Sequence, residues 1–285
     1  MLRVLQILTL SACMAACTRG REPITAPSPV PGFDVLTAET GVGGLPARIR
    51  HTATGMVLVL IGPGTFTMGS PVSEPERDGD EAQHRVEIDP AFYLGETEVT
   101  VAEWRQVMGT VPEDFNDNDE LPATGVNWHA AKRFLERLHA RGEVGWRLPT
   151  EAEWEYACRA GTESPFSFGD RVSVTMANFD GNRPYPGSEP GPRPNSPVPV
   201  RSLSPNPWGL YEMHGNVWEW CEDLYVEKPA DGVPVEDDVG GASRVMRGGS
   251  WFSRADQLRC GYRDGYPPNS AGEKYGLRLA YTIPR

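Results

Sequence analysis

The chain has 285 residues and a formal net charge of −12, with 39% hydrophobic and 23% charged residues. This composition is typical of one or two folded domains and excludes a disordered or fibrous chain. The 31 glycines and 27 prolines favour short strands and ordered turns over a helical bundle. The acidic balance carries no stripe of lysine and arginine, so we expect no nucleic-acid partner, because phosphate binding needs clustered cations.

Residues 1–17 predict a bacterial lipoprotein signal peptide. Arg3 precedes an apolar run from Val4 to Leu10 that is too short to span a bilayer, and small residues then lead to two cysteines. Cleavage before Cys17 leaves an apolar segment of more usual length, whereas Leu10 at position −3 favours Cys13. We take Cys17 as the lipidation site, with Cys13 as the alternative. The expected location is the bacterial cell envelope, lipid-anchored to a membrane, and the absence of Asp after either cysteine favours the outer membrane.

Residues 18–47 contain four prolines between Pro23 and Pro31 and little hydrophobic periodicity, which predicts a tether between the anchor and a folded domain. The run Met56–Ile61 predicts a buried strand, and Thr65–Gly69 is expected to be its hairpin partner. Further extended segments are expected at 85–89 and 92–99.

Three helices are predicted from their N-terminal capping residues and apolar spacing. Thr100 with Glu103 forms a capping-box pattern that predicts the start of a helix, and Gly109 is expected to end this helix. Asn127 precedes a helix at 128–141, and a second capping box opens a helix at 151–159 that ends by Gly161.

Nine prolines between Pro184 and Pro207 predict a long irregular loop. Extended pieces return at 244–248 and 276–281. We find no internal repeat or boundary, so residues 48–285 are interpreted as one loop-rich α+β domain.

Cys158, Cys221 and Cys260 could form one disulfide in any of three pairings in an oxidising compartment, leaving one thiol over. The sequence does not choose among these pairings.

The segment from Gly209 to Cys221 holds the most informative pattern, a carboxylate at Glu219 between Trp218 and Trp220. It indicates a turn around a hard cation, with backbone carbonyls and the carboxylate as oxygen ligands. The alternative is that the two indoles anchor the core and Glu219 caps a turn.

The ordered set of motifs resembles the formylglycine-generating enzyme, or sulfatase-modifying factor, family. The segments that carry the resemblance are 56–69, 96–100, 122–128, 146–157, 214–220, 247–251 and 276–280. The resemblance implies an α+β, C-type-lectin-like formylglycine-generating-enzyme fold with few regular elements and two structural calcium ions.

Carried over by position, one calcium site would use Glu219 with backbone oxygens of His214, Gly215 and Val217. The other would begin at Asn178 and Phe179, with Asp180 as a local substitute for a ligand that the proline-rich insert does not reproduce.

Family enzymes hold copper(I) between two cysteines five residues apart, because two thiolates suit a soft ion. Cys260 matches the second cysteine, but Ala255 occupies the first position. Ser253 and Trp218 fall where the family places active-site polar and aromatic groups. Cys158 matches a family disulfide cysteine whose partner position is Leu279 here.

Two functions are compatible with these residues. In the first, an exported domain uses oxygen to oxidise a cysteine in an extended peptide of Cys-x-Pro-x-Arg type, with Cys260 as the attacking or metal-binding thiolate. In the second, a non-catalytic, calcium-stabilised lectin-like module binds a protein or glycan at the cell surface. Cys260 would then be a disulfide partner or a buried small hydrophobe.

Overall fold

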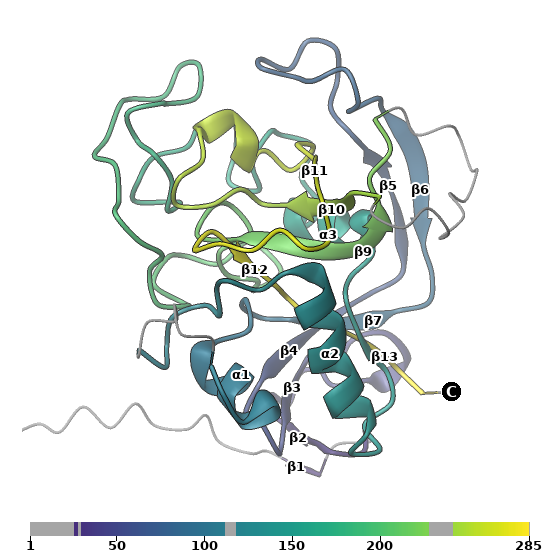
Figure 1. Cartoon of the computed structure of the whole chain (residues 1–285). Helices are drawn as coiled ribbons and strands as arrows, with labels where there is room; N and C mark the ends of the chain where they lie inside the picture. Colours follow the sequence, from purple (N-terminus) through teal and green to yellow (C-terminus); the bar gives the residue numbers. More distant parts are fainter. Residues whose placement is uncertain (1–25, 28–29, 112–117, 228–241, 285) are drawn as a thin grey trace, which may run out of the picture.

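Seven short strands form the larger sheet of the computed structural model, which describes residues 26–27, 30–111, 118–227 and 242–284 (Figure 1). Their order across the sheet is β1, β2, β3, β4, β7, β13, β8, and every neighbouring pair is antiparallel. The bounds are β1 (Ala26–Pro27), β2 (Phe33–Val35), β3 (Arg48–His51), β4 (Val57–Ile61), β7 (Phe92–Gly95), β8 (Trp146–Arg147) and β13 (Ala280–Thr282).

A second sheet of four strands carries the Trp218–Glu219–Trp220 motif on one of its two central strands. Its order is β11 (Asp264–Tyr266), β10 (Arg244–Arg247), β9 (Trp218–Leu224) and β12 (Tyr275–Gly276). A separate two-stranded sheet pairs β5 (Gly64–Met68) with β6 (His84–Ile88).

The expected hairpin between 56–61 and 65–69 is wrong. Strand β4 already has β3 and β7 on its two sides, so β5 leaves the large sheet after the Gly62–Pro63–Gly64 turn and pairs with β6 instead. The extended piece predicted at 276–281 is also corrected, because it divides between β12 of the second sheet and β13 of the first. Arg278, with no exposed surface, lies in this crossing between the sheets.

The three predicted helices are present as α1 (Val101–Met108), α2 (Trp128–His139) and α3 (Glu151–Arg159). Thr100 and Thr150 each close a capping box, and the Asn127 side chain accepts the Ala130 N–H. Gly109 ends α1 in the left-handed region, as expected. Helix α3 ends at Arg159, as predicted, but its C-terminal cap is Ala160, which takes the left-handed conformation with φ of 48°, one residue before Gly161.

Residues 160–217 contain no helix or strand, which confirms the predicted irregular segment. A small apolar cluster supports it, formed by Phe166, Val172, Ala177, Phe179, Tyr185, Ala255 and Leu258. Ala255 and Leu258 belong to the short helix η2 (Ala255–Leu258), so the loop packs against the segment before Cys260.

The tether extends less far than predicted. Phe33 and Val35 are buried, and β2 pairs with β3 in the large sheet. The short helix η1 (Val42–Gly44) follows before β3. Residues 30–47 are therefore part of the domain, and the predicted lipidation site lies outside the described residues. Among those residues, no helix has the length and apolar character needed to cross a membrane.

Candidate functional site

Strand β9 carries Glu219 into the protein interior, where its carboxylate is fully engaged. Arg278 donates to it from Nη2 at 2.7 Å and from Nε at 3.0 Å, and the Trp154 indole donates to Oε2 at 2.7 Å. Arg278 has no exposed surface and also donates to the backbone oxygens of Gly95 and Tyr211. Glu219 thus anchors the crossing between the two sheets.

Two further glutamates lie in the electrostatic surroundings of this ion pair. Glu98 has no exposed surface, and its Oε1 accepts the Asn216 side-chain amide at 3.0 Å. Its Oε2 is buried and has no hydrogen-bond partner among the described residues. The Glu212 carboxylate accepts backbone N–H groups of Arg201 at 3.1 Å and Leu203 at 3.3 Å.

Glu98, Glu212, Glu219 and Arg278 form a glutamate cluster, which holds more acidic groups than basic ones. Burial raises the pKa of Glu98 well above its ordinary value, and the neighbouring Glu212 carboxylate raises it further. Burial also raises the pKa of Glu212, against the two backbone hydrogen bonds. Three carboxylates face the one buried guanidinium of Arg278, so the cluster needs protons or a cation to be balanced.

These residues fit calcium by their chemistry, since the ion prefers oxygen ligands and Glu98 Oε2 is an unused, buried carboxylate oxygen. The three carboxylates do not gather closely enough, within the part of the chain that is described, to form a ligand group by themselves. An ion here would therefore need backbone oxygens as well, as predicted for His214, Gly215 and Val217. Its identity as calcium stays a prediction.

The turn that presents those backbone oxygens has a demanding geometry. Gly215 has φ of 84°, and a Cβ at this position would meet the Asn178 carbonyl oxygen at 2.3 Å. Asn216 follows with φ of 63° and also has no exposed surface. This close approach explains why the sequence places Gly and Asn before the tryptophans.

The structure brings the start of the second predicted calcium site against this turn. Asn178 forms an isolated bridge with Gly215, and its side-chain amide donates to Asn216 Oδ1 at 3.1 Å. Phe179 is buried in the loop cluster. The Asp180 carboxylate instead accepts the Asn182 N–H and lies about 4 Å from the Arg183 and Arg193 guanidiniums.

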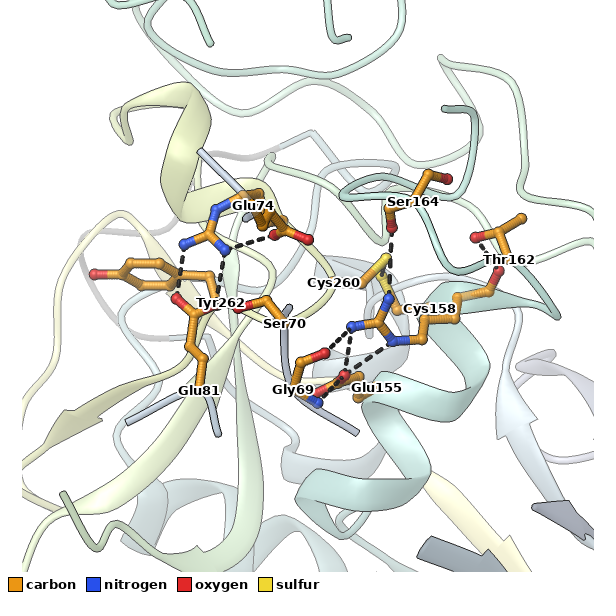
Figure 2. A network of polar contacts seen from close by, with 12 residues as sticks. Gly69, Ser70, Glu74, Glu81, Glu155, Cys158, Thr162, Ser164, Cys260 and Tyr262 are labelled. Carbon is orange, nitrogen blue, oxygen red and sulfur yellow. Dashed lines mark hydrogen bonds and ion pairs between the residues drawn. The ribbon is translucent and has the colours of Figure 1, made fainter. Parts of the chain in front are cut away.

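The thiols form a separate buried site. The Sγ atoms of Cys158 and Cys260 are 3.4 Å apart, and both residues have no exposed surface. Figure 2 shows the two sulfur atoms side by side near Glu155 and Gly69. All three cysteines are free thiols, and the contact between Cys158 and Cys260 favours this pairing over the two that involve Cys221.

His214 completes this site through its imidazole ring. Its Nδ1 lies 2.7 Å from the Leu258 carbonyl oxygen, which requires a proton on Nδ1, and its Nε2 accepts the Ser167 N–H at 3.1 Å. Burial lowers the pKa of His214 to about 4. Burial also raises the pKa of the Cys158 thiol, so this thiol is neutral at physiological pH.

Cys158, His214 and Cys260 have ligand atoms within 4.8 Å of one another, the one such group in the described ranges. Both ring nitrogens already have hydrogen-bond partners, and binding a metal would break one of these bonds. The two-cysteine copper arrangement is not reproduced either, because Ala255 is a buried member of the loop cluster. The copper site of the family, with two cysteines five residues apart, is therefore not reproduced here.

The remaining predicted catalytic residues do not join Cys260 in one site. The Ser253 hydroxyl accepts the Ser250 N–H at 3.1 Å, and Trp218 packs near Tyr262 and Tyr266 in the main core. No hydrogen bond links either residue to the Cys260 thiol in the described structure. Sequence reasoning missed Glu98 and Glu212, although both stand in or beside motifs that carried the resemblance.

The loop-rich layers and the buried glutamate site define a formylglycine-generating-enzyme-like fold. The solved structure of PvdO from Pseudomonas aeruginosa aligns with a TM-score of 0.71 and 26% identity, over 83% of this chain and 98% of that one. The family model for the sulfatase-modifying factor enzyme 1-like domain matches residues 44–283, and the chain belongs to this family.

Curated relatives with different names share this domain. Formylglycine-generating enzyme of Bos taurus is 29% identical over 78% of this chain and 74% of its own length. Serine/threonine-protein kinase pkn1 of Chlamydia caviae is 36% identical over 57% of this chain, but the match spans only 24% of the kinase. This chain thus spans about three quarters of the formylglycine-generating enzyme but only about a quarter of the kinase.

Proposed function

We propose that this chain is a non-catalytic recognition module on the sulfatase-modifying factor scaffold. The observation that carries the proposal is that Cys260 has no exposed surface and lies 3.4 Å from Cys158. Exchange with a peptidyl cysteine requires an accessible thiolate. Each of the three described cysteines is buried, so none offers its sulfur to a substrate.

Surrounding contacts support a structural role for these sulfur atoms. Arg159 donates to the Gly69 carbonyl oxygen and to Glu155, which ties the end of α3 to the end of β5 beside the cysteine pair (Figure 2). The Cys260 N–H donates to the Pro165 carbonyl oxygen at 2.7 Å. Moving Cys260 to the surface would break its own hydrogen bond to Pro165.

Calcium at the glutamate cluster would act as a structural ion in this function. It would neutralise buried carboxylates and hold the turn at 214–217, and the chain's own residues would do the binding elsewhere on the surface. The predicted lipid anchor at Cys17 would place the module at the bacterial cell envelope, facing an exported protein.

The test is an oxidation assay on the full chain. A Cys-x-Pro-x-Arg peptide is incubated with the protein, calcium, oxygen and a thiol reductant, with and without copper(I), and aldehyde formation is followed by mass spectrometry. We expect no product above the protein-free reaction, in wild type and in Cys260→Ala alike. Turnover that needs Cys260 would overturn the proposal and restore the oxidase.

A further inference from the structure

A pocket of about 520 Å³ lies between the two-stranded sheet and the end of α3, and Arg159 is part of its lining. Its lining includes Thr65, Phe66 and Thr67 of β5, together with Tyr156, Thr162 and Trp208. The lining mixes aromatic rings with hydroxyl groups, which is the usual composition of a specific binding site.

The aromatic residues form one continuous wall. The ring centroids of Phe66 and Tyr156 are 5.2 Å apart, and those of Tyr156 and Trp208 are 4.9 Å apart. All three side chains are only partly buried. Such a wall would bury one apolar side chain of a ligand.

Strand β5 adds an open backbone edge to this pocket. The Gly69 N–H donates to Glu155 and the Gly69 carbonyl oxygen accepts from Arg159, so the backbone of Gly69 faces α3. The next residue, Ser70, donates its N–H to the Glu81 carbonyl oxygen on the opposite side. Residues two apart in a strand direct their backbone groups to the same side.

The pairing of β5 with β6 is regular from Gly64 to Met68, so this alternation runs through the strand without a bulge. Among the described strands, β5 pairs with β6 alone, so its other edge has no strand partner. Continuing the alternation of Gly69 and Ser70 into β5 directs the N–H and C=O groups of Thr65 and Thr67 to that edge. Among the described residues, no group outside the β5–β6 pairing bonds to the backbone of Thr65 or Thr67. Figure 1 shows β5 between β6 and the body of the domain.

We propose that this pocket binds an extended polypeptide segment, which adds to the β5 edge as a third strand. A row of alternating backbone donors and acceptors is complementary to another extended backbone. The aromatic wall would take one apolar side chain of that segment. The edge is open for only two residues before α3 covers it, which suits a stretch of about three residues and is too short for a dimer of this chain.

This inference deepens the recognition function proposed above and names its partner class. Its probe lacks cysteine, so its outcome is independent of the oxidation assay. The probe is a peptide with blocked ends and the sequence Lys-Thr-Val-Leu-Val-Thr-Lys, titrated into the full chain by calorimetry. A second peptide with the same side chains carries N-methyl groups at alternate residues, which removes the backbone donors that would pair with β5.

Thr67→Pro is the discriminating variant, because proline removes an N–H that faces the pocket and leaves the β5–β6 pairing intact. We expect it and Trp208→Ala each to weaken binding at least tenfold, and the N-methylated peptide not to bind. Glu87→Pro is the matched control. Glu87 pairs with Thr65 in β6, so its N–H faces the opposite edge of the same sheet. Binding to this variant should equal wild type.

Three results would overturn the inference. Equal loss of binding in Thr67→Pro and Glu87→Pro would show that only the integrity of the sheet matters. Dimerisation of the chain by sedimentation, abolished by Thr67→Pro, would assign the edge to a second copy. Binding of a neutral trisaccharide such as maltotriose or cellotriose, but of neither peptide, would assign the pocket to carbohydrate.

Discussion

Two buried polar sites lie on either side of the His214–Val217 turn, and they differ in charge balance. The glutamate cluster has three carboxylates, one buried guanidinium and an unpartnered oxygen on Glu98. The cysteine site has the neutral thiol of Cys158 and a neutral imidazole whose nitrogens both have partners. Burial penalises the first site unless a proton or cation is present, whereas the second is stable as it stands. Dependence on a metal should therefore belong to the glutamates and not to the cysteines.

The largest effect should come from Arg278→Met, which removes the one buried cation of the glutamate cluster. Leaving Glu219 buried without its partner should cost about 3–5 kcal/mol of unfolding free energy. Urea unfolding of the full chain measures it. Arg147→Met is the control, because Arg147 pairs with Glu153 near the surface and should cost no more than about 1 kcal/mol. Equal losses in the two variants would contradict the role given to Arg278.

The cysteine site should respond to acid through His214. Its pKa is about 4 in the folded state against an ordinary value of 6.5, so the unfolded state binds more protons between these values. Stability is full above pH 6.5 and should fall by up to about 3 kcal/mol as the pH drops towards 4. His51 has a similarly lowered pKa, so His214→Gln should remove about half of the combined loss.

Unfolding free energies measured between pH 4 and pH 7 test this expectation. His129→Gln, at an exposed position of α2, serves as the control and should leave the acid response unchanged. An unaltered acid response in His214→Gln would show that the ring is not held neutral in the fold.

The glutamate cluster should respond in the opposite direction. The pKa of Glu98 is raised in the folded state, so the metal-free protein loses stability as the pH rises from about 4.5 through the folded value. Calcium at a hundred times its Kd should restore about 2.7 kcal/mol, seen as a higher Tm. Glu98→Gln should abolish most of this gain and flatten the loss at higher pH.

Glu103→Gln is the matched control for calcium, because Glu103 is a partly buried glutamate of raised pKa that serves the α1 capping box. It should keep the calcium response of wild type. Equal Tm values with calcium and with chelator in wild type would exclude the calcium site.

Local signals made the helices predictable, because each begins with a side chain that caps its own backbone. The seven-stranded sheet was not predictable in this way. Whether β5 pairs with β4 or with β6 depends on which edges are already occupied, and those edges belong to strands far along the chain. The family resemblance supplied the overall fold, which periodicity alone could not.

The site was predicted in part, for a related reason. Glu219 stood out because two tryptophans flank it, but its partner Arg278 is 59 residues away and gave no local signal. Cys158 and Cys260 are 102 residues apart, so three pairings stayed open until the fold placed them together. Glu98 was overlooked because its distinguishing feature, an oxygen without a partner, exists only in three dimensions.

The smallest effect should come from Cys260→Ala, and it sharpens the contrast between the two sites. A buried cysteine in an apolar cluster behaves as a small hydrophobe, so its removal should cost about 1 kcal/mol, as should Cys221→Ala. If the two thiols next to each other are joined by a disulfide in the isolated protein, Cys260→Ala should instead cost about 2–4 kcal/mol while Cys221→Ala stays near 1. Intact mass before and after reduction distinguishes these cases, since the disulfide form is lighter by two hydrogens.

In neither case should calcium change the difference in unfolding free energy between Cys260→Ala and Cys221→Ala, because the cysteine site has no charge for the ion to balance. A calcium-dependent difference would show that the two sites are coupled through the His214–Val217 turn.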